Sequence, residues 1–184
     1  MSADRELVEA VLSRRPGAFE RLVREYQGLV AHIVFRLVRH ADVVDELSQD
    51  TLMRVHRRLH QLRFESTLKA WIGRVAYTIG LRHLQKQAAS VETADDGERF
   101  EREAADENIE SAHSAREAAV IVREAVDALP PLQRTIVSLY HLDELSIPEI
   151  AEITGPPSGT IKSHLFRTRR QLREMLEARL GGEA

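Results

Sequence analysis

Apolar residues recur at helical spacing through almost the whole chain, and this restricts the possible fold more than any other feature. Over residues 17–38, after the helix-opening pair Pro16-Gly17, they follow the 3.6-residue period of an α-helix. The same spacing returns over residues 42–62 and over residues 66–87, where Ser66 is the expected N-cap. No stretch alternates with the two-residue period of a strand for long enough to require a sheet. The pattern predicts an all-α fold.

The helical spacing is interrupted once, over residues 90–111. This segment is rich in Asp, Glu, Ala and Gly, and it has too few large apolar side chains to fold alone. We expect a flexible acidic linker here. It would separate a helical domain of residues 1–89, which includes a short helix at residues 4–14, from a second domain of four helices at residues 112–184. The predicted architecture is two small helical domains joined by this linker.

Charge is distributed unevenly, so the net charge of −3 is a poor guide to binding partners. Residues 92–117 hold ten acidic and three basic side chains, whereas residues 158–173 hold five basic side chains and no acidic one. The chain has no cysteine, which excludes disulfides and thiolate chemistry. No apolar run approaches the roughly 20 residues of a membrane span. We expect a soluble, cytoplasmic protein with no membrane insertion.

The last part of the chain has the pattern of a helix-turn-helix. Ser146 and Glu149 form a capping box around Pro148, and Gly155 supplies the left-handed turn that ends this short helix. The following helix turns its apolar residues inward and is basic on its outer face. The outward side chains that we expect at DNA are Lys162, Ser163, Phe166, Arg167 and Arg170. A helical hairpin with a solvated basic face is the simpler alternative, and the capping box, the small-residue turn and the lack of acids favour DNA binding.

Acidic and amide side chains gather early in the helix expected at residues 42–62. They are Asp42, Asp45, Glu46, Gln49 and Asp50. Acids in a first turn stabilise the helix dipole, which explains Asp45 and Glu46 and leaves Asp50 unexplained. An acidic ridge facing solvent would suit a basic partner. The residues alone leave the two interpretations open.

The third long helix carries basic and aromatic side chains after the loop of residues 62–66. One face presents Arg74, Tyr77, Thr78, Arg82 and Gln85 at helical spacing. Arginines beside an aromatic ring suit single-stranded or distorted DNA, because the cations neutralise phosphates and bases stack on rings. The alternative is that Trp71 and Tyr77 belong to the core. We favour the core for Trp71 and DNA contact for Arg74 and Arg82.

Five segments resemble the extracytoplasmic-function group of bacterial sigma factors, minimal members of the sigma-70 family that keep only regions 2 and 4. The region 2 motifs are residues 17–26 (GAFERLVREY), 45–51 (DELSQDT) and 71–77 (WIGRVAY). The region 4 motifs are residues 129–134 (LPPLQR) and 159–167 (GTIKSHLFR). They occur in the family's order and spacing and cover almost everything except the linker.

The resemblance implies a protein that binds core RNA polymerase (β and β′ subunits) and promoter DNA, and that promotes strand opening for transcription initiation. The residues implied for the polymerase contact are Asp45, Glu46, Gln49 and Asp50. Those implied for the −10 element are Arg63, Phe64, Ser66, Arg74, Tyr77, Thr78 and Arg82. Those implied for the −35 element are Thr160, Lys162, Ser163, Phe166, Arg167 and Arg170. An anti-sigma factor or another regulator is an implied partner, and no cofactor, metal or catalytic residue is implied.

The sequence departs from the family pattern at three positions of the implied −10 site. Thr78 stands where many members have Asn, Arg82 where Asp is frequent, and Phe64 where the loop usually has Gly.

Two other classes of protein are alternatives to a sigma factor. A helix-turn-helix regulator with an N-terminal sensing domain would need a ligand pocket or a dimer seam. An enzyme could use His56 and His60 as metal ligands, but no HExxH motif or Gly-rich phosphate loop accompanies them.

Overall fold

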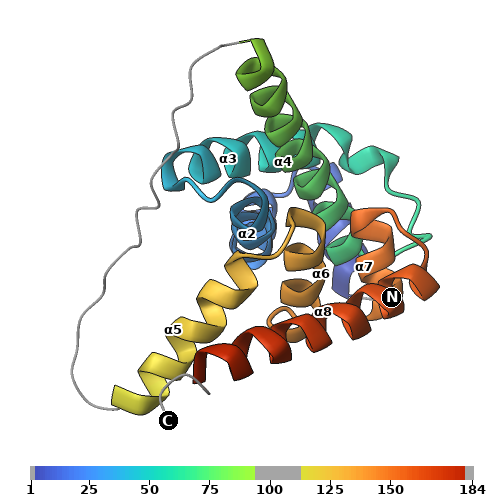
Figure 1. Cartoon of the computed structure of the whole chain (residues 1–184). Coiled ribbons are helices and arrows are strands. Elements are labelled where there is room, and N and C mark those ends of the chain that lie inside the picture. Colours follow the sequence, from blue (N-terminus) through green and yellow to red (C-terminus); the bar gives the residue numbers. More distant parts are fainter. Residues whose placement is uncertain (1–2, 94–112, 181–184) are drawn as a thin grey trace.

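The computed structural model describes residues 3–93 and 113–180, which form eight α-helices, one 3-10 turn and no strand (Figure 1). The first half contains α1 (Ala3–Leu12), α2 (Ala18–Val38), α3 (Ala41–Arg58), the turn η1 (Leu59–Gln61) and α4 (Leu68–Thr93). The second half contains α5 (His113–Asp127), α6 (Pro131–His141), α7 (Ile147–Thr154) and α8 (Ser158–Leu180). The predicted all-α fold is confirmed.

Helix α2 is the centre of the first half. Its apolar residues at helical spacing include Leu22, Val30, Ile33 and Val34, all fully buried. Helices α3 and α4 pack on this face, and α1 packs on α2 from outside. The 3.6-residue pattern seen in the sequence is therefore the buried stripe of a three-helix core.

Helix α4 begins one residue later than predicted. The Oγ1 of Thr67 accepts a hydrogen bond from the backbone N–H of Ala70 at 3.1 Å, and the Thr67 carbonyl accepts one from Trp71 at 3.0 Å. A residue with both bonds is the N-cap. The N-cap predicted at Ser66 is therefore wrong, because Ser66 lies before the first helical hydrogen bond.

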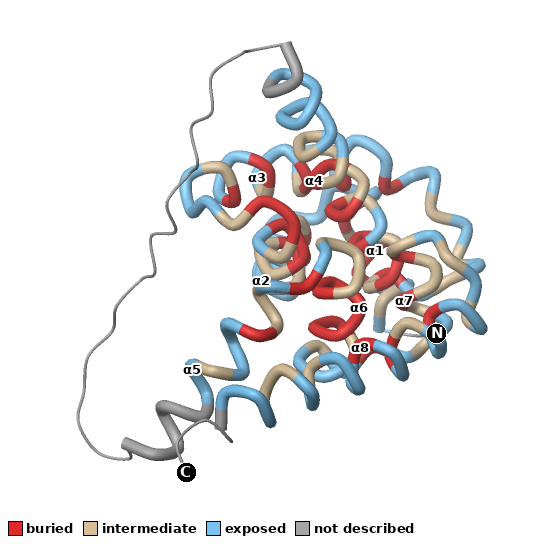
Figure 2. Tube along the Cα trace, viewed as in Figure 1, coloured by how far each residue is buried: buried red, intermediate tan, exposed pale blue. Residues whose placement is uncertain are grey.

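The C-terminus of α4 also differs from the prediction, since the helix continues past Gln87 to Thr93. Its last turns extend away from the core, and residues 85–90 are all exposed (Figure 2). An exposed helix needs no apolar stripe, and the pair Ala88-Ala89 has the highest helix propensity. The start of the predicted 90–111 linker is thus helical. Its remaining residues lie outside the described part of the chain.

The second half is built around α6. Its residues Thr135, Ile136, Ser138 and Leu139 are almost fully buried, and α7 and α8 pack on this helix. Helix α5 packs along α8 (Figure 1). The four helices predicted for this part of the chain are all present.

The two halves pack directly on each other. Helix α7 lies on α4 and α6 lies on α2 (Figure 1). The buried apolar residues of both halves form one continuous core. One close contact is at Gly73, where an added Cβ would lie 2.7 Å from the Cδ1 of Ile153. The sequence predicted two domains separated by a linker and gave no sign of this packing.

Candidate functional site

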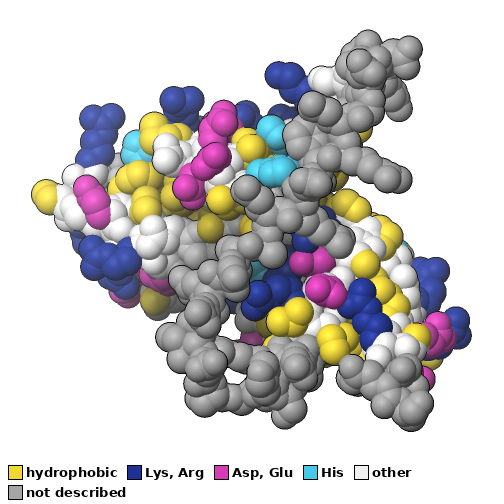
Figure 3. All heavy atoms as spheres, turned by 60° about the vertical axis from the view of Figure 1, so that its left-hand side comes forward, with side chains coloured by type: hydrophobic (Ala, Val, Ile, Leu, Met, Phe, Trp, Pro, Cys, Tyr) yellow, Lys and Arg dark blue, Asp and Glu magenta, His cyan; other side chains and the backbone are white. Residues whose placement is uncertain are grey.

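The acidic ridge lies on the outer face of α3. Asp45, Glu46, Gln49 and Asp50 are all exposed, whereas Val44, Leu47, Thr51 and Val55 on the opposite face are buried. Because α3 begins at Ala41, its only first-turn acid is Asp42. The helix dipole therefore accounts for Asp42 alone, and the interpretation of Asp45 and Glu46 as first-turn acids is wrong. In the space-filling view, acidic side chains stand out among hydrophobic ones on the upper part of the face (Figure 3).

A basic groove of about 210 Å³ lies between α3 and α4. Its lining residues are Arg54, Arg58, Gln61, Trp71, Arg74, Val75, Thr78 and Arg82. Three of them, Arg74, Thr78 and Arg82, are among the residues that the resemblance implied for the −10 element, and helical spacing predicted them on one face of α4. The groove also places Arg54 and Arg58 of α3 opposite them, which gives four guanidinium groups around one hollow.

The exposure of both aromatic residues differs from the sequence interpretation. Trp71, expected in the core, is partly exposed, and Tyr77, expected at DNA, is buried. Trp71 is only half-buried: it packs on the core and also lines the basic groove. Tyr77 was predicted to share the exposed face of Arg74, but only 7% of it is exposed, and burial raises the pKa of its phenol. Tyr77 belongs to the buried apolar core, so its predicted position on the exposed face of α4 is wrong.

The loop before α4 does not line the groove, although it holds three of the predicted −10 residues. Arg63 is exposed, Ser66 is half-buried, and Phe64 packs partly on the core with the guanidinium of Arg5 5.0 Å from its ring centroid. Phe64 has a φ of +55°. This left-handed conformation is the one that favours glycine, the residue that the resemblance leads one to expect in this loop.

The helix-turn-helix has the predicted geometry. The Oγ of Ser146 accepts the backbone N–H of Glu149, and the Glu149 carboxylate accepts the backbone N–H of Ser146 at 3.0 Å. Gly155 has a φ of +100° and ends α7. These bonds fix the start and the end of α7, and the turn then sets the direction in which α8 leaves.

The outer face of α8 carries all six predicted −35 residues in exposed positions. They are Thr160, Lys162, Ser163, Phe166, Arg167 and Arg170. Ile161, Leu165 and Thr168 face the core, which holds the helix in one rotation about its axis. Phe166 is 71% exposed, unusually high for an aromatic side chain. Arg170 pairs with Glu174 at 3.4 Å, whereas Lys162 has no hydrogen bond or ion pair within the described residues.

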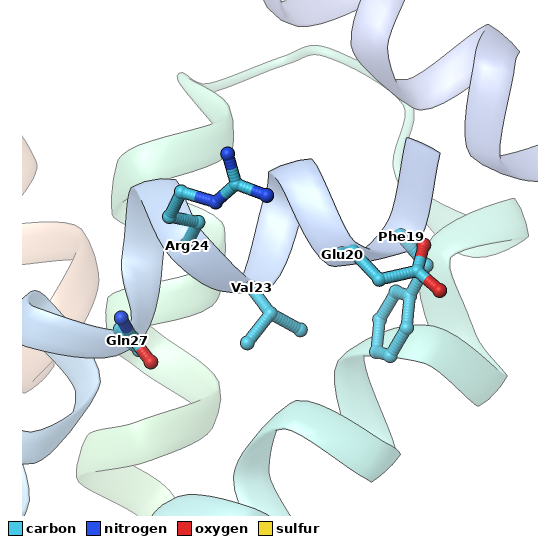
Figure 4. Close-up of a pocket in the computed structure, with 5 residues that line it drawn as sticks. All are labelled: Phe19, Glu20, Val23, Arg24 and Gln27. Atoms are coloured by element: carbon cyan, nitrogen blue, oxygen red, sulfur yellow. The ribbon is translucent and has the colours of Figure 1, made fainter. Parts of the chain in front are cut away.

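A larger hollow, of about 340 Å³, lies along α2 and contains none of the predicted site residues (Figure 4). It is lined by Phe19, Glu20, Val23, Arg24 and Gln27 of that one helix. No group of three or more His, Asp or Glu side chains in residues 3–93 and 113–180 is arranged to hold a metal ion. None of the helices in these ranges is both long and apolar enough to span a bilayer.

Comparison with known proteins identifies both halves. Residues 22–90 match the family described as Sigma-70 region 2, and residues 119–172 match Sigma-70, region 4. The chain is 30% identical to the RNA polymerase sigma-H factor of Pseudomonas aeruginosa, over 95% of this chain and 94% of that protein. It is 33% identical to the ECF RNA polymerase sigma-E factor of Escherichia coli strain K12, over 90% of each chain.

Two solved structures share the fold. The sigma factor RpoE, in complex with the anti-sigma factor NepR from Bartonella quintana, superposes with a TM-score of 0.73 at 24% identity, covering 88% of this chain and 98% of that one. CnrH, in complex with the cytosolic domain of CnrY, has a TM-score of 0.70 at 22% identity, covering 96% and 99%. The two matched regions and the full-length relatives place this chain in the sigma-70 family, as a promoter-recognition sigma factor of the extracytoplasmic-function group.

Proposed function

We propose that three surfaces of this sigma factor divide the work of transcription initiation. The acidic ridge of α3 binds core RNA polymerase, the basic groove and the loop of residues 62–66 bind the −10 element, and the outer face of α8 binds the −35 element. In this assignment residues 1–89 act as region 2, residues 112–184 act as region 4, and the acidic segment between them lies toward the RNA exit path. The observation that carries the proposal is the basic groove, because it gathers arginines from two helices.

The chemistry of the groove suits an unpaired strand. Four guanidinium groups neutralise phosphates, and the accessible part of Trp71 offers a surface on which a base can stack. The Oγ1 of Thr78 donates to the carbonyl of Arg74 at 2.7 Å. That bond engages the hydroxyl proton and leaves the oxygen free to accept a hydrogen bond from a base.

The geometry of α8 suits duplex DNA. Thr160, Lys162 and Ser163 lie in its first two turns, the part of a recognition helix that reaches base edges in the major groove. Arg167 and Arg170 lie further along, where phosphates are nearer. The alternative, a helix-turn-helix regulator with an N-terminal helical sensing domain, is not favoured, because both sigma regions are matched.

The same assignment extends to partners and place of action. RpoE and CnrH were solved in complex with NepR and with the cytosolic domain of CnrY, and we propose that a regulator of the anti-sigma kind binds this chain as well. The protein would act in the cytoplasm, where polymerase and promoters are, and it would act by binding rather than by catalysis.

The direct test is initiation in vitro. Core polymerase is mixed with the purified protein and a template library that is randomised over the −35 and −10 elements, and the transcripts are sequenced. Initiation at a defined subset of templates, absent with polymerase alone or with a variant lacking residues 112–184, is the expected result. Specific duplex binding by the free protein, without any polymerase-dependent transcript, would contradict the proposal.

A further inference from the structure

Arg5 has no stabilising role within the helix that carries it. It lies in the first turn of α1, where the helix dipole opposes a positive charge, and its side chain is exposed. Glu9 stands one turn further on, the usual place for an ion-pair partner. Within the described residues, however, Arg5 makes no ion pair and no hydrogen bond. Its guanidinium instead lies 5.0 Å from the ring centroid of Phe64, a cation–π contact that joins α1 to the loop of residues 62–66.

Helix α1 is a fixed support for this contact. Its Leu7 and Val8 are buried, and the helix packs on α2 and on the turn η1. At its first turn, the hydroxyl of Tyr26 on α2 donates to the Asp4 carboxylate at 3.3 Å. Burial and the charge of Asp4 raise the pKa of Tyr26, so the phenol keeps the proton that this bond needs. The backbone that carries Arg5 is therefore held beside η1, next to the start of the loop.

The loop of residues 62–66 has few other contacts that could fix its shape. The last backbone hydrogen bond before it is made by Leu62, at 3.1 Å, and the next involves the N-cap Thr67. Between these two, no backbone or side-chain hydrogen bond to residues 63–66 is formed by any part of the chain that the structure describes. The loop is held mainly by the ring of Phe64, which packs partly on the core and is contacted by Arg5.

The backbone of Phe64 makes that support necessary. Its φ of +55° lies in the left-handed region, which glycine adopts freely and which a residue with a side chain adopts only at a cost. Without a contact that favours this conformation, the backbone would return to a negative φ and redirect the neighbouring side chains. Those neighbours include Arg63 and Ser66, both assigned above to the −10 element. The residue that strains the loop thus also supplies the ring through which α1 holds it.

We propose that Arg5 is a positioning residue for recognition of the −10 element: from α1 it holds Phe64, and through Phe64 it holds the loop of residues 62–66 in the shape that meets promoter DNA. The inference rests on the proposed assignment of this loop to the −10 element. A loop that is held in shape before DNA arrives loses less conformational entropy on binding. An exposed cation–π contact changes an equilibrium by about two- to fivefold, which sets the size of the expected effects.

Limited trypsin digestion of the free protein tests the hold on the loop without polymerase. When opening and closing are fast relative to cleavage, the cleavage rate of the bond between Arg63 and Phe64 measures the open fraction of the loop. Arg5→Ala should raise that rate about two- to fivefold, and Arg5→Lys, which keeps the cation, should restore most of the wild-type rate. Cleavage after the exposed Lys86 of α4 is the internal standard and should not change. The matched control is Arg21→Ala, which removes an exposed arginine of α2 that contacts no ring in the described residues.

Transcription by the holoenzyme tests the consequence for the promoter. Templates with a fixed −35 element and a randomised −10 element are transcribed, and initiation from the preferred −10 sequences is divided by initiation from the remainder. Arg5→Ala should lower this −10 ratio about two- to fivefold, and Arg5→Lys should restore it. The ranking of sequences over a randomised −35 element should stay the same. A general loss of stability would instead weaken recognition of both elements alike.

Replacement of Phe64 by glycine separates positioning from a direct contact with DNA. Glycine adopts the left-handed conformation without support, so in the Phe64→Gly background Arg5→Ala should change neither the cleavage rate nor the −10 ratio. If Arg5→Ala costs as much in that background as in wild type, Arg5 acts directly on DNA and the proposal is overturned. Wild-type cleavage of the Arg5→Ala protein, or faster cleavage with an unchanged −10 ratio, would also overturn it. If wild type starts no specific transcript while cleavage still depends on Arg5, the proposed function has failed and the hold of Arg5 on the loop has not.

Discussion

The carboxylate of Glu149 shows how one residue serves both the local and the tertiary structure. It accepts hydrogen bonds from the backbone and the hydroxyl of Ser146, at 3.0 and 2.7 Å, and from Thr67 of the other half at 3.0 Å. Partial burial on its own would raise the pKa of Glu149. The hydrogen bonds from Ser146 and Thr67, with the charge of Lys69, outweigh that effect and lower the pKa below its usual value.

Replacement of Glu149 should therefore destabilise the protein. Glu149→Ala removes half of the capping box, and we expect the free energy of unfolding to fall by about 1 kcal/mol. Urea unfolding at neutral pH measures this loss. Glu152→Ala, one turn along the same helix and without a hydrogen bond or ion pair in the described residues, is the control and should change stability by less than about 0.5 kcal/mol. Equal losses in the two variants would contradict the role given to Glu149.

The stabilisation by Glu149 should also depend on pH with a definite sign. Its pKa is lower in the folded chain than in the unfolded chain, so the ionised carboxylate stabilises the fold fully above the unfolded value. That contribution is lost as the pH falls through the folded pKa. The stability difference between wild type and Glu149→Gln should accordingly shrink on acidification below about pH 4. A difference that grows in acid would contradict the assignment.

At the scale of single helices, the spacing of residues predicted part of the basic groove and missed the rest. Arg74, Thr78 and Arg82 are four residues apart on α4, so sequence alone places them on one face. Arg54 and Arg58 are related in the same way on α3, but nothing in the spacing says that α3 lies beside α4 at this point. Tyr77 was misassigned because spacing gives the direction of a side chain and not the width of the buried stripe.

The groove leads to a prediction about strand opening. Arg74→Ala and Arg82→Ala should impair promoter melting more than initial duplex capture, because the groove suits an unpaired strand. Arg54→Ala should behave alike, since Arg54 lines the same groove from α3. Permanganate reactivity of holoenzyme complexes on a linear template, compared with a template that carries a pre-melted bubble, separates the two steps. If the bubble rescues none of the variants, the groove does not act in melting.

Helix α8 leads to a prediction about specificity. Lys162 lies one turn past the helix start and is free to contact a base edge, whereas Arg170 lies further along, paired with Glu174. Lys162→Ala should relax −35 preference, at a loss of roughly 1–3 kcal/mol on the preferred base. Arg170→Ala should weaken all sequences alike and lower the salt slope by about one unit. Holoenzyme transcription from a −35 library at two salt concentrations measures the sequence preference and the salt dependence. If Lys162→Ala leaves the ranking of sequences unchanged and Arg170→Ala changes it, the proposed placement of α8 in the major groove is wrong.

For the molecule as a whole, the helix content and the helix-turn-helix could be predicted, and the packing of the two halves could not. Periodicity and capping are local properties that a sequence displays directly. The interface instead depends on single residues such as Gly73, Asp127, Arg134 and Asp143, which have no common spacing and meet only after both halves have folded. The acidic composition of the segment between the halves predicted two separate domains. It carries no information about the surfaces through which those two halves pack on each other.

The proposed contact with core polymerase uses a surface that the folded chain presents to solvent. Asp45, Glu46 and Asp50 are exposed, and the buried face of α3 holds the helix without them, so reversing their charge should leave the fold intact. Asp45→Arg with Asp50→Arg should abolish co-purification with core polymerase, because like charges then meet the basic partner surface.

The matched control for this loss is Glu9→Arg with Glu20→Arg, the same change of charge at exposed positions of α1 and α2. It should retain polymerase binding, and both pairs should keep the helical circular dichroism spectrum. Binding of the wild type should weaken as salt rises, since salt screens attraction between exposed charges. Retention of polymerase by a folded Asp45→Arg/Asp50→Arg protein would remove the ridge from the interface. Loss of polymerase by both pairs would show that net charge, rather than this face of α3, governs the association.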